Sequence, residues 1–440
     1  MIRASMRAMR RDGYGLPVTT GVASALEAYD SAVEGLLGWD ARALDLFRRA
    51  AAEDPGFALA HAGAAVCLFL EERFAEAREA AKGARAAGGA QTERERSHVE
   101  ALALLVEGKV RGAEQAMREH LAEYPRDLVV FQRLYFIWFW QGRFPEMLAF
   151  TRALAPHHAG DSFMQGLHAF ALEQAGRCPE AVSLARAAIG KNPRDAWAIH
   201  ALAHALYEMA AFDTGITRLP PLIHPCTNLN WFRNHLLWHL TLMHFARGDY
   251  ARASRLGRAI FERAPSSIAG DLHDSISLLW RLALAGQDVK ARWAPFARIA
   301  GERLDRQGLL FHAAHLAMAL AGGGDWAMAD RQLAVLRDRS PRDGTGLTGD
   351  VLVPLVEGLQ AFAAGDYRRV IERIEPLRSR VIELGGSRAQ RDVFHDTLLE
   401  ACFRAGDMER AERLLAERVA RRPDHFWKTR TGSRVAPGVN

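Results

Sequence analysis

Apolar residues recur along most of the chain at the three- and four-residue spacing of an α-helix. Residues 201–211 and 398–405 show this spacing, and few segments alternate apolar and polar positions with the period of two that a strand needs. The pattern predicts an all-α protein, with helical hairpins from about Leu26 to Arg422.

Turn glycines divide the predicted helices into repeated pairs. Gly108, Gly142 and Gly176 are evenly spaced along the chain. Their interval is the period of about 34 residues that is typical of the tetratricopeptide repeat, in which each hairpin buries its apolar face against its neighbours. Later Gly-Asp turns, at Gly324, Gly365 and Gly406, are also evenly spaced, at a wider interval. We therefore predict a right-handed superhelical solenoid of tetratricopeptide-like hairpins.

The organisation that we expect has one large unit and two short ends. We assign residues 1–20 to a flexible N-terminal segment, residues 21–422 to a single solenoid and residues 423–440 to a C-terminal tail. Residues 213–230 are expected to form an irregular insertion, because several prolines in this stretch oppose a regular long helix.

The composition indicates where in the cell the protein is expected and which partners are not. The four cysteines form no CxxC pair and are too few for a secreted disulfide framework, so a cytoplasmic location is expected. No apolar run reaches the length of roughly 18 residues that a bilayer-spanning helix needs, so no membrane span is expected. The 57 basic and 52 acidic residues are mostly interleaved, which is typical of solvated helix faces, and nucleic acid is not an expected partner. Phosphate-binding glycine loops, HExxH and GxSxG motifs are absent from the sequence.

Histidines concentrate in the middle of the chain, where seven of the 17 lie between residues 200 and 273. His200 and His204 are one helical turn apart, and His235 and His239 repeat that spacing, so each pair lies on one helix face. In a tetratricopeptide unit the first pair is expected to face the concave groove. Adjacent first helices pack about 8–10 Å apart, so we expect imidazoles from both to meet.

This cluster is consistent with two kinds of chemistry. His200, His204, His235 and His239 are candidate ligands for a divalent metal such as zinc, iron or manganese. Without a metal, the same four histidines are candidate general acids and bases, with Asp274 or Asp271 orienting one of them.

Two further interpretations stay open at this point. The first is ligand recognition, for which the candidate residues are Trp231, Arg233, Trp238, His273, Arg281, His312, His315, Arg391 and His395. The second is nucleophilic catalysis by Cys226, which would require a nearby histidine and a lowered thiol pKa. Against all of these stands the possibility that the histidines are buried structural residues, hydrogen-bonded to carbonyls or carboxylates.

Several motifs resemble the tetratricopeptide repeat protein 38 family. They include residues 15–20, the stretch ending at His204, residues 234–239 and residues 274–282. The resemblance covers nearly the whole chain. It implies a superhelical tetratricopeptide-like protein of uncharacterised biochemical role, and it carries over no catalytic assignment.

Two functions are therefore predicted as alternatives. The first is a tetratricopeptide-repeat protein that binds a small polar ligand or a peptide in a concave, histidine-rich central groove. The alternative is an enzyme on the same scaffold, with or without a metal ion, that acts on a small molecule through the histidine and aspartate cluster. An open groove favours the first function, and a closed site converging on the histidines favours the second. A homo-oligomer is a further expectation.

Overall fold

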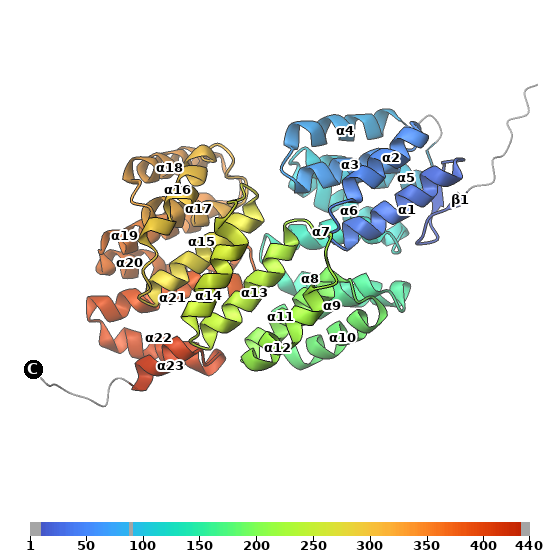
Figure 1. Cartoon of the computed structure of the whole chain (residues 1–440). Helices are drawn as coiled ribbons and strands as arrows, with labels where there is room; N and C mark the ends of the chain where they lie inside the picture. The colour runs from blue at the N-terminus through green and yellow to red at the C-terminus, as the bar shows by residue number, and fades with distance from the viewer. Residues whose placement is uncertain (1–9, 88–90, 433–440) are drawn as a thin grey trace, which may run out of the picture.

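The computed structural model describes residues 10–87 and 91–432 and confirms the all-α prediction (Figure 1). The first twelve α-helices are α1 (Ala23–Leu37), α2 (Ala43–Glu53), α3 (Ala58–Leu70), α4 (Phe74–Ala86), α5 (Glu93–Val106), α6 (Val110–Glu123), α7 (Leu128–Phe139), α8 (Phe144–Leu154), α9 (Ser162–Gln174), α10 (Cys178–Lys191), α11 (Ala196–Glu208) and α12 (Phe212–Ile223). We call α1–α12 the N-terminal half.

The remaining helices form the C-terminal half. They are α13 (Phe232–Ala246), α14 (Tyr250–Gly257), α15 (Ala269–Leu284), α16 (Ala294–Glu302), α17 (Leu310–Gly322), α18 (Trp326–Arg339), α19 (Val353–Ala364), α20 (Tyr367–Ile374), α21 (Arg388–Ala405), α22 (Met408–Arg421) and α23 (His425–Gly432). Short 3-10 or π turns are η1 (Ala155–His158), η2 (Arg258–Glu262), η3 (Lys290–Arg292), η4 (Ser340–Arg342), η5 (Thr348–Leu352), η6 (Glu375–Leu377) and η7 (Val381–Leu384). One small hairpin pairs β1 (Arg10–Arg11) with β2 (Pro17–Val18).

A repeated aspartate begins the first helix of successive hairpins in the N-terminal half. Asp127, Asp161 and Asp195 stand before α7, α9 and α11, and each carboxylate accepts a hydrogen bond from the backbone N–H three residues later. Such a cap satisfies one of the N–H groups that a helix start leaves unpaired. The aspartates are as far apart along the chain as Gly108, Gly142 and Gly176, so the caps follow the same period as the turn glycines.

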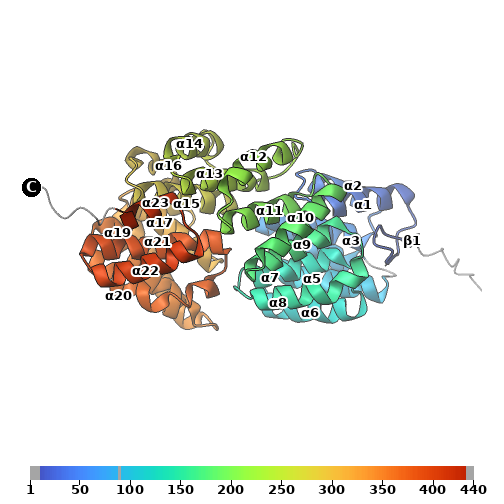
Figure 2. The ribbon, with the colours of Figure 1, turned by 90° about the horizontal axis from the view of Figure 1, so that it is seen from below.

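The N-terminal and C-terminal halves lie side by side and contact each other at several places (Figures 1 and 2). At one contact the carboxylate of Glu72 accepts a hydrogen bond from the backbone N–H of Ala269 at 2.7 Å and forms an ion pair with Arg303. At another, the guanidinium of Arg422 donates to Glu208 at 2.8 Å. These contacts cover the inner first helices with protein.

Residues 213–230 are mostly helical, which corrects the prediction of an irregular insertion. Helix α12 contains Pro220 and Pro221, both in its last turn. Each proline keeps a helical φ but removes one backbone donor, and the helix ends within three residues of the pair, at Ile223. The irregular stretch is the short connection 224–231. It is held by backbone hydrogen bonds to the α1–α2 turn, including that from Asn230 N–H to the carbonyl of Trp39 at 3.0 Å.

Both chain ends contribute more structure than predicted. The β1–β2 hairpin buries Val18 completely, and Asp12 beside it pairs with buried Arg94 at 3.0 Å. At the other end, α23 occupies much of the expected tail, and its Trp427 is buried. Apolar burial and ion pairs therefore anchor both segments. The predicted flexible residues 1–9 and tail residues 433–440 lie outside the described part of the chain.

A glycine pair tests the closure of the two halves. Gly142 and Gly176 occupy equivalent turns with φ of 68° and 79°. A Cβ atom on Gly142 would lie 2.0 Å from the carbonyl oxygen of Ile382 in the C-terminal half, whereas one on Gly176 would contact nothing within 4 Å. Alanine at either site costs about 1 kcal/mol for the left-handed backbone. Gly142→Ala should cost about 1–3 kcal/mol more because of overpacking. Urea unfolding of both variants measures this difference, and equal losses would show that the halves do not meet here.

Candidate metal centre

Two adjacent helices carry the four central histidines. His200 and His204 lie on α11, which the Asp195 cap begins, and His235 and His239 lie on α13, which packs against α11. The side chains have relative exposures of 2, 0, 6 and 0%, respectively. The predicted faces of the two helices are therefore turned toward each other inside the protein.

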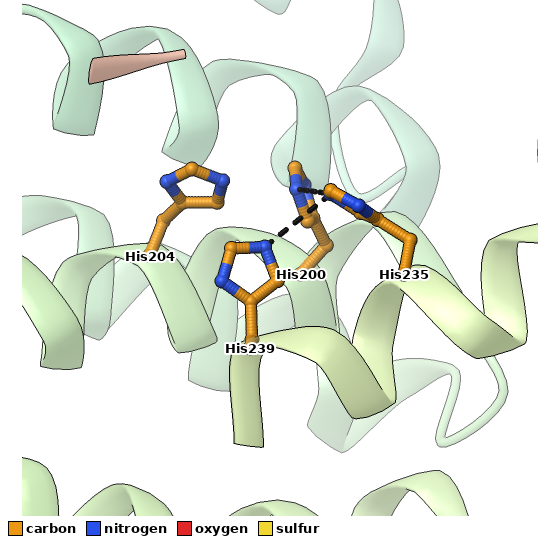
Figure 3. A group of neighbouring side chains, drawn as sticks. All are labelled: His200, His204, His235 and His239. Carbon is orange, nitrogen blue, oxygen red and sulfur yellow. Dashed lines mark hydrogen bonds between the residues drawn. The ribbon is translucent and has the colours of Figure 1, made fainter. Parts of the chain in front are cut away.

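The four imidazoles form one compact group (Figure 3). The Nε2 atom of His235 lies 3.0 Å from Nε2 of His200 and 3.3 Å from Nε2 of His239. The ring of His204 stands beside them, with its centroid 4.3 Å from that of His239. One ligand nitrogen from each residue lies within 4.8 Å of the other three. This is the meeting of imidazoles that the helical spacing predicts.

Buried carboxylates flank the group on two sides. Asp274 on α15 accepts a hydrogen bond from Nδ1 of His235 at 2.8 Å, which leaves the Nε2 lone pair of His235 directed toward the other imidazoles. Glu173 on α9 lies 3.6 Å from Nδ1 of His204. A carboxylate that accepts a hydrogen bond from a ligating histidine, as Asp274 does from His235, is the usual support of a metal site, since it fixes the tautomer and the ring orientation. Glu173 makes no hydrogen bond to His204.

The protonation of the group suits metal binding. Burial, reinforced by the neighbouring histidines, lowers the pKa of His200, His204 and His239 well below 6.5. These rings are therefore neutral at neutral pH, and each offers a lone pair. Burial also raises the pKa of Asp274, against the lowering effect of His235, and raises that of Glu173 to about 8, with Glu208 adding to the rise.

Several polar atoms around the group have no hydrogen-bond partner among the described residues. They are Nδ1 of His200, both ring nitrogens of His204, Nδ1 of His239, Oδ1 of Asp274, Oε1 of Glu173 and Nε1 of Trp238. A buried polar atom without a partner is costly, and such atoms are uncommon in native proteins. Lone pairs without a partner beside this group of imidazoles fit a centre that binds a cation.

Three other predicted histidines form a separate group near α7. Nε of Arg303 donates to Nε2 of His312, so His312 carries its proton on Nδ1 and donates it to Nε2 of His273 at 3.0 Å. His315 donates from Nδ1 to the carbonyl of Phe311 at 2.9 Å. His273 and His312 are thus hydrogen-bonded to each other, although Nδ1 of His273 and Nε2 of His315 have no partner among the described residues. None of the three joins the four-histidine group.

The remaining predicted ligand residues are spread over several places. Trp238 stacks on His235 with centroids 5.4 Å apart, and Arg281 lies over Trp238 while donating to backbone carbonyls. Trp231 meets His235 only at its edge. The others lie elsewhere: Arg233 is partly exposed on α13, Arg391 donates to the carbonyl of Gly386 over Phe144, and His395 lines a small cavity with Arg378 and Arg418. They do not build one ligand site.

The predicted open groove is not what surrounds the histidines. All four are buried, because the C-terminal half packs across the inner helices of the solenoid. Cys226 is also buried, and its thiol donates to the carbonyl of Leu222 at 3.6 Å. Burial raises the pKa of this thiol, which is opposite to what a nucleophilic cysteine requires.

A second buried group, missed in the sequence, combines His98, His120 and Asp127. Both imidazoles contact Oδ2 of Asp127, at 2.8 and 3.1 Å. The guanidinium of Arg94 lies 2.8 Å from the same oxygen. Arg94 already supplies the cation, so this group is an ion-pair network and not a metal site. Glu173 was missed as well, and the available signal was an acid that directly follows the apolar residues 169–172.

Comparisons with known proteins concern the fold alone. No family model matches the chain. It is similar to a structure of Naa15/Naa10 bound to HypK-THB, at 13% identity and a TM-score of 0.25, over 92% of this chain and 65% of that one. It is also similar to the P58(IPK) TPR domain, at 14% identity and a TM-score of 0.20, over 80% of this chain and 100% of that one.

Both similarities are weak, and neither decides the fold of this chain. The chain spans slightly less than two thirds of the first of these structures, and TM-scores this low carry no argument about function. Membership of the tetratricopeptide repeat protein 38 family stays a prediction.

Within the described residues, no helix is both long and apolar enough to cross a bilayer. What the chain has is a tetratricopeptide-like helical repeat with a buried four-histidine centre.

The buried histidines predict a loss of stability in mild acid. Burial lowers the pKa of His315 to about 3, whereas an unfolded histidine titrates near 6.5. The unfolded chain therefore binds more protons below pH 6.5, and stability present above that pH is lost as the pH falls toward 3. His315→Leu should reduce the slope of unfolding free energy by about 1.4 kcal/mol per pH unit below about pH 6.

Urea unfolding between about pH 7.5 and 5 measures this slope. The control is His157→Leu, because His157 is exposed. If both variants kept the slope of the unchanged protein, His315 would not be the buried neutral imidazole described here.

Proposed function

We propose that this protein binds one divalent transition-metal ion through His200, His204, His235 and His239, on a tetratricopeptide-like scaffold. The observation that carries the proposal is the placement of four buried ligand nitrogens, from two adjacent helices, within 4.8 Å of one another. Tetrahedral zinc with bonds of about 2.0–2.1 Å places its ligand nitrogens about 3.4 Å apart. The Nε2 separations of 3.0 and 3.3 Å at His235 are close to that value.

Zinc is the metal that best suits this donor set. Imidazole binds zinc, copper, nickel and iron, whereas manganese and magnesium favour oxygen donors. The carboxylates of Asp274 and Glu173 stand behind histidines instead of facing the other imidazoles. A set of four imidazole nitrogens with no thiolate or carboxylate among them supports a site for one borderline-soft cation.

Four protein ligands support a stabilising role for the metal. Structural zinc sites are closed by four side chains, whereas catalytic sites keep a position for water. Here the ligands come from both α11 and α13, and the supporting acids come from α9 and α15. A metal ion would therefore tie together four helices where the N-terminal and C-terminal halves join.

The enzyme alternative depends on His204. Within the described residues this ring has no hydrogen bond to the other three imidazoles, and both its nitrogens are without a partner. A centre of His200, His235 and His239 alone would leave a fourth position for water, which a metal ion can activate. Binding of a peptide at the same place is less well supported, because the four side chains are covered by protein.

Metal analysis of the purified, untagged protein tests the proposal. We expect about one equivalent of zinc, and a gain in unfolding free energy of about 2.7 kcal/mol when free zinc exceeds its Kd a hundredfold. His239→Gln should lose the bound zinc and most of this gain, because one of four ligands is removed. The exposed His157→Gln should behave like the unchanged protein.

The melting temperatures of the metal-free variants show whether a substitution disturbs folding and not only metal binding. If His239→Gln folds and still gains the full stabilisation from zinc, the ion lies elsewhere and the proposal is wrong. His204→Gln distinguishes the two roles. Retention of zinc by this variant would favour the three-histidine centre with an open position.

The carboxylate behind His235 gives a second test. Asp274→Asn removes the charge that orients the ring and should weaken zinc affinity by about 10–100-fold. Asp271→Asn is the matched control, since Asp271 lies three residues earlier on α15 and accepts instead from Asn234 at 3.1 Å. Competition with a chromophoric zinc chelator measures both affinities. Equal affinities would show that Asp274 does not support a ligand.

A further inference from the structure

Arg133 on α7 is a buried cation without an acidic partner among the described residues. Its side chain has a relative exposure of 3%, and Nε has no hydrogen-bond partner in the same part of the chain. The guanidinium donates to the side-chain oxygen of Gln132, whose own amide donates to the carbonyl of Leu37 at 3.3 Å. An isolated buried charge is costly, so it calls for an explanation.

The other buried arginines show how the protein normally satisfies such a group. Four of them form ion pairs with carboxylates: Arg94, Arg303, Arg418 and Arg422. Arg281 and Arg391 donate to backbone carbonyls instead. Within residues 10–87 and 91–432, Arg133 has neither kind of partner, and the one ionisable group that interacts with it is the thiol of Cys67.

Cys67 does not supply the missing charge. Burial raises the pKa of this thiol to about 12, so it is neutral at neutral pH. Burial lowers the pKa of Arg133 to about 10, with Cys67 opposing the change, and the guanidinium remains charged. A positive charge is therefore held inside the N-terminal half with no anion from the described residues beside it.

The surface next to Arg133 is aromatic and partly accessible. Residues 133, 136 and 140 follow the three- and four-residue spacing of one helix face. The guanidinium of Arg133 lies over the ring of Phe136 at 5.1 Å, and both Phe136 and Trp140 are only partly buried. Trp140 reaches the C-terminal half, with its ring 5.9 Å from that of His273. Figures 1 and 2 show α7 on the side of the N-terminal half that faces the C-terminal half.

We propose that Arg133 binds the carboxylate of an organic acid whose apolar body packs on Phe136 and Trp140. Nε and a terminal nitrogen of a guanidinium form the planar pair of donors that matches two carboxylate oxygens. An aromatic or aliphatic body on the same ligand would cover the partly exposed rings beside it. The ligand is either a free carboxylic acid or the C-terminal carboxylate of a peptide, since both present the same group. This site is independent of the four-histidine centre.

Calorimetric titration with paired acids and amides tests the site. The probes are N-acetylphenylalanine and its amide, and a short peptide ending in phenylalanine with a free or an amidated C-terminus. We expect the free acid of at least one pair to bind at least about tenfold more tightly than its amide, because only the acid pairs with the guanidinium. Binding of the peptide acid alone would identify a peptide C-terminus as the ligand.

Arg133→Gln should abolish this preference for the acid, and Arg133→Lys should weaken it because lysine lacks the planar donor pair. The control is Arg298→Gln, which removes an exposed arginine paired with Glu302. His239→Gln should bind the acid normally, so failure of the metal proposal leaves this one unaffected. Should Arg133→Gln fold poorly, the acid and amide comparison on the unchanged protein decides. No binding by either acid, equal binding of acid and amide, or an unchanged preference in a folded Arg133→Gln would overturn the proposal.

Discussion

The closure of the solenoid on itself is the constraint on which the rest of the structure depends. In an open repeat, polar side chains on the inner helices are solvated by water. Here the C-terminal half covers them, so each buried polar group needs a partner within the protein or a bound ligand. The backbone of the two halves meets so closely that a Cβ atom on Gly385 would lie 2.5 Å from the carbonyl oxygen of Trp140. The need to satisfy buried polar groups in the interior follows from this contact between the halves.

Most buried arginines form ion pairs, and two of these pairs, Arg303 with Glu72 and Arg422 with Glu208, also join the two halves. Arg422 is completely buried, lies 3.9 Å from the ring centre of Tyr207, and pairs with Glu208, Asp392 and Asp424. Removing one member of such a network would leave the others buried and unpaired, which costs about 3–5 kcal/mol. Around the four-histidine centre and at Arg133, the described residues leave polar atoms of the side chains without a partner. These buried polar atoms without hydrogen-bond partners are the reason why we propose ligands at these two places.

The candidate site was partly predictable, and the reason lies in its geometry. His200 with His204, and His235 with His239, are local pairs whose four-residue spacing places each pair on one face. The packing of consecutive first helices then brings the pairs together. Asp274 could be named for the same reason, because α15 is the first helix of the next hairpin along the chain. Glu173 and Arg133 could not be assigned a role, since a charged residue in an apolar helix has a meaning only when its neighbours are known.

The sequence by itself determined the helices, their pairing into repeated hairpins and the faces on which the histidines lie, because these depend on residues within one or two helical turns or one repeat. It misjudged α12, since the prolines end this helix near Ile223 and leave the residues before them helical. Only the tertiary structure decided that the groove is closed and that the ligand candidates His312 and His395 lie apart from the central four. Those outcomes depend on the rotation accumulated over many hairpins, and small differences at each junction add up to decide which distant residues meet.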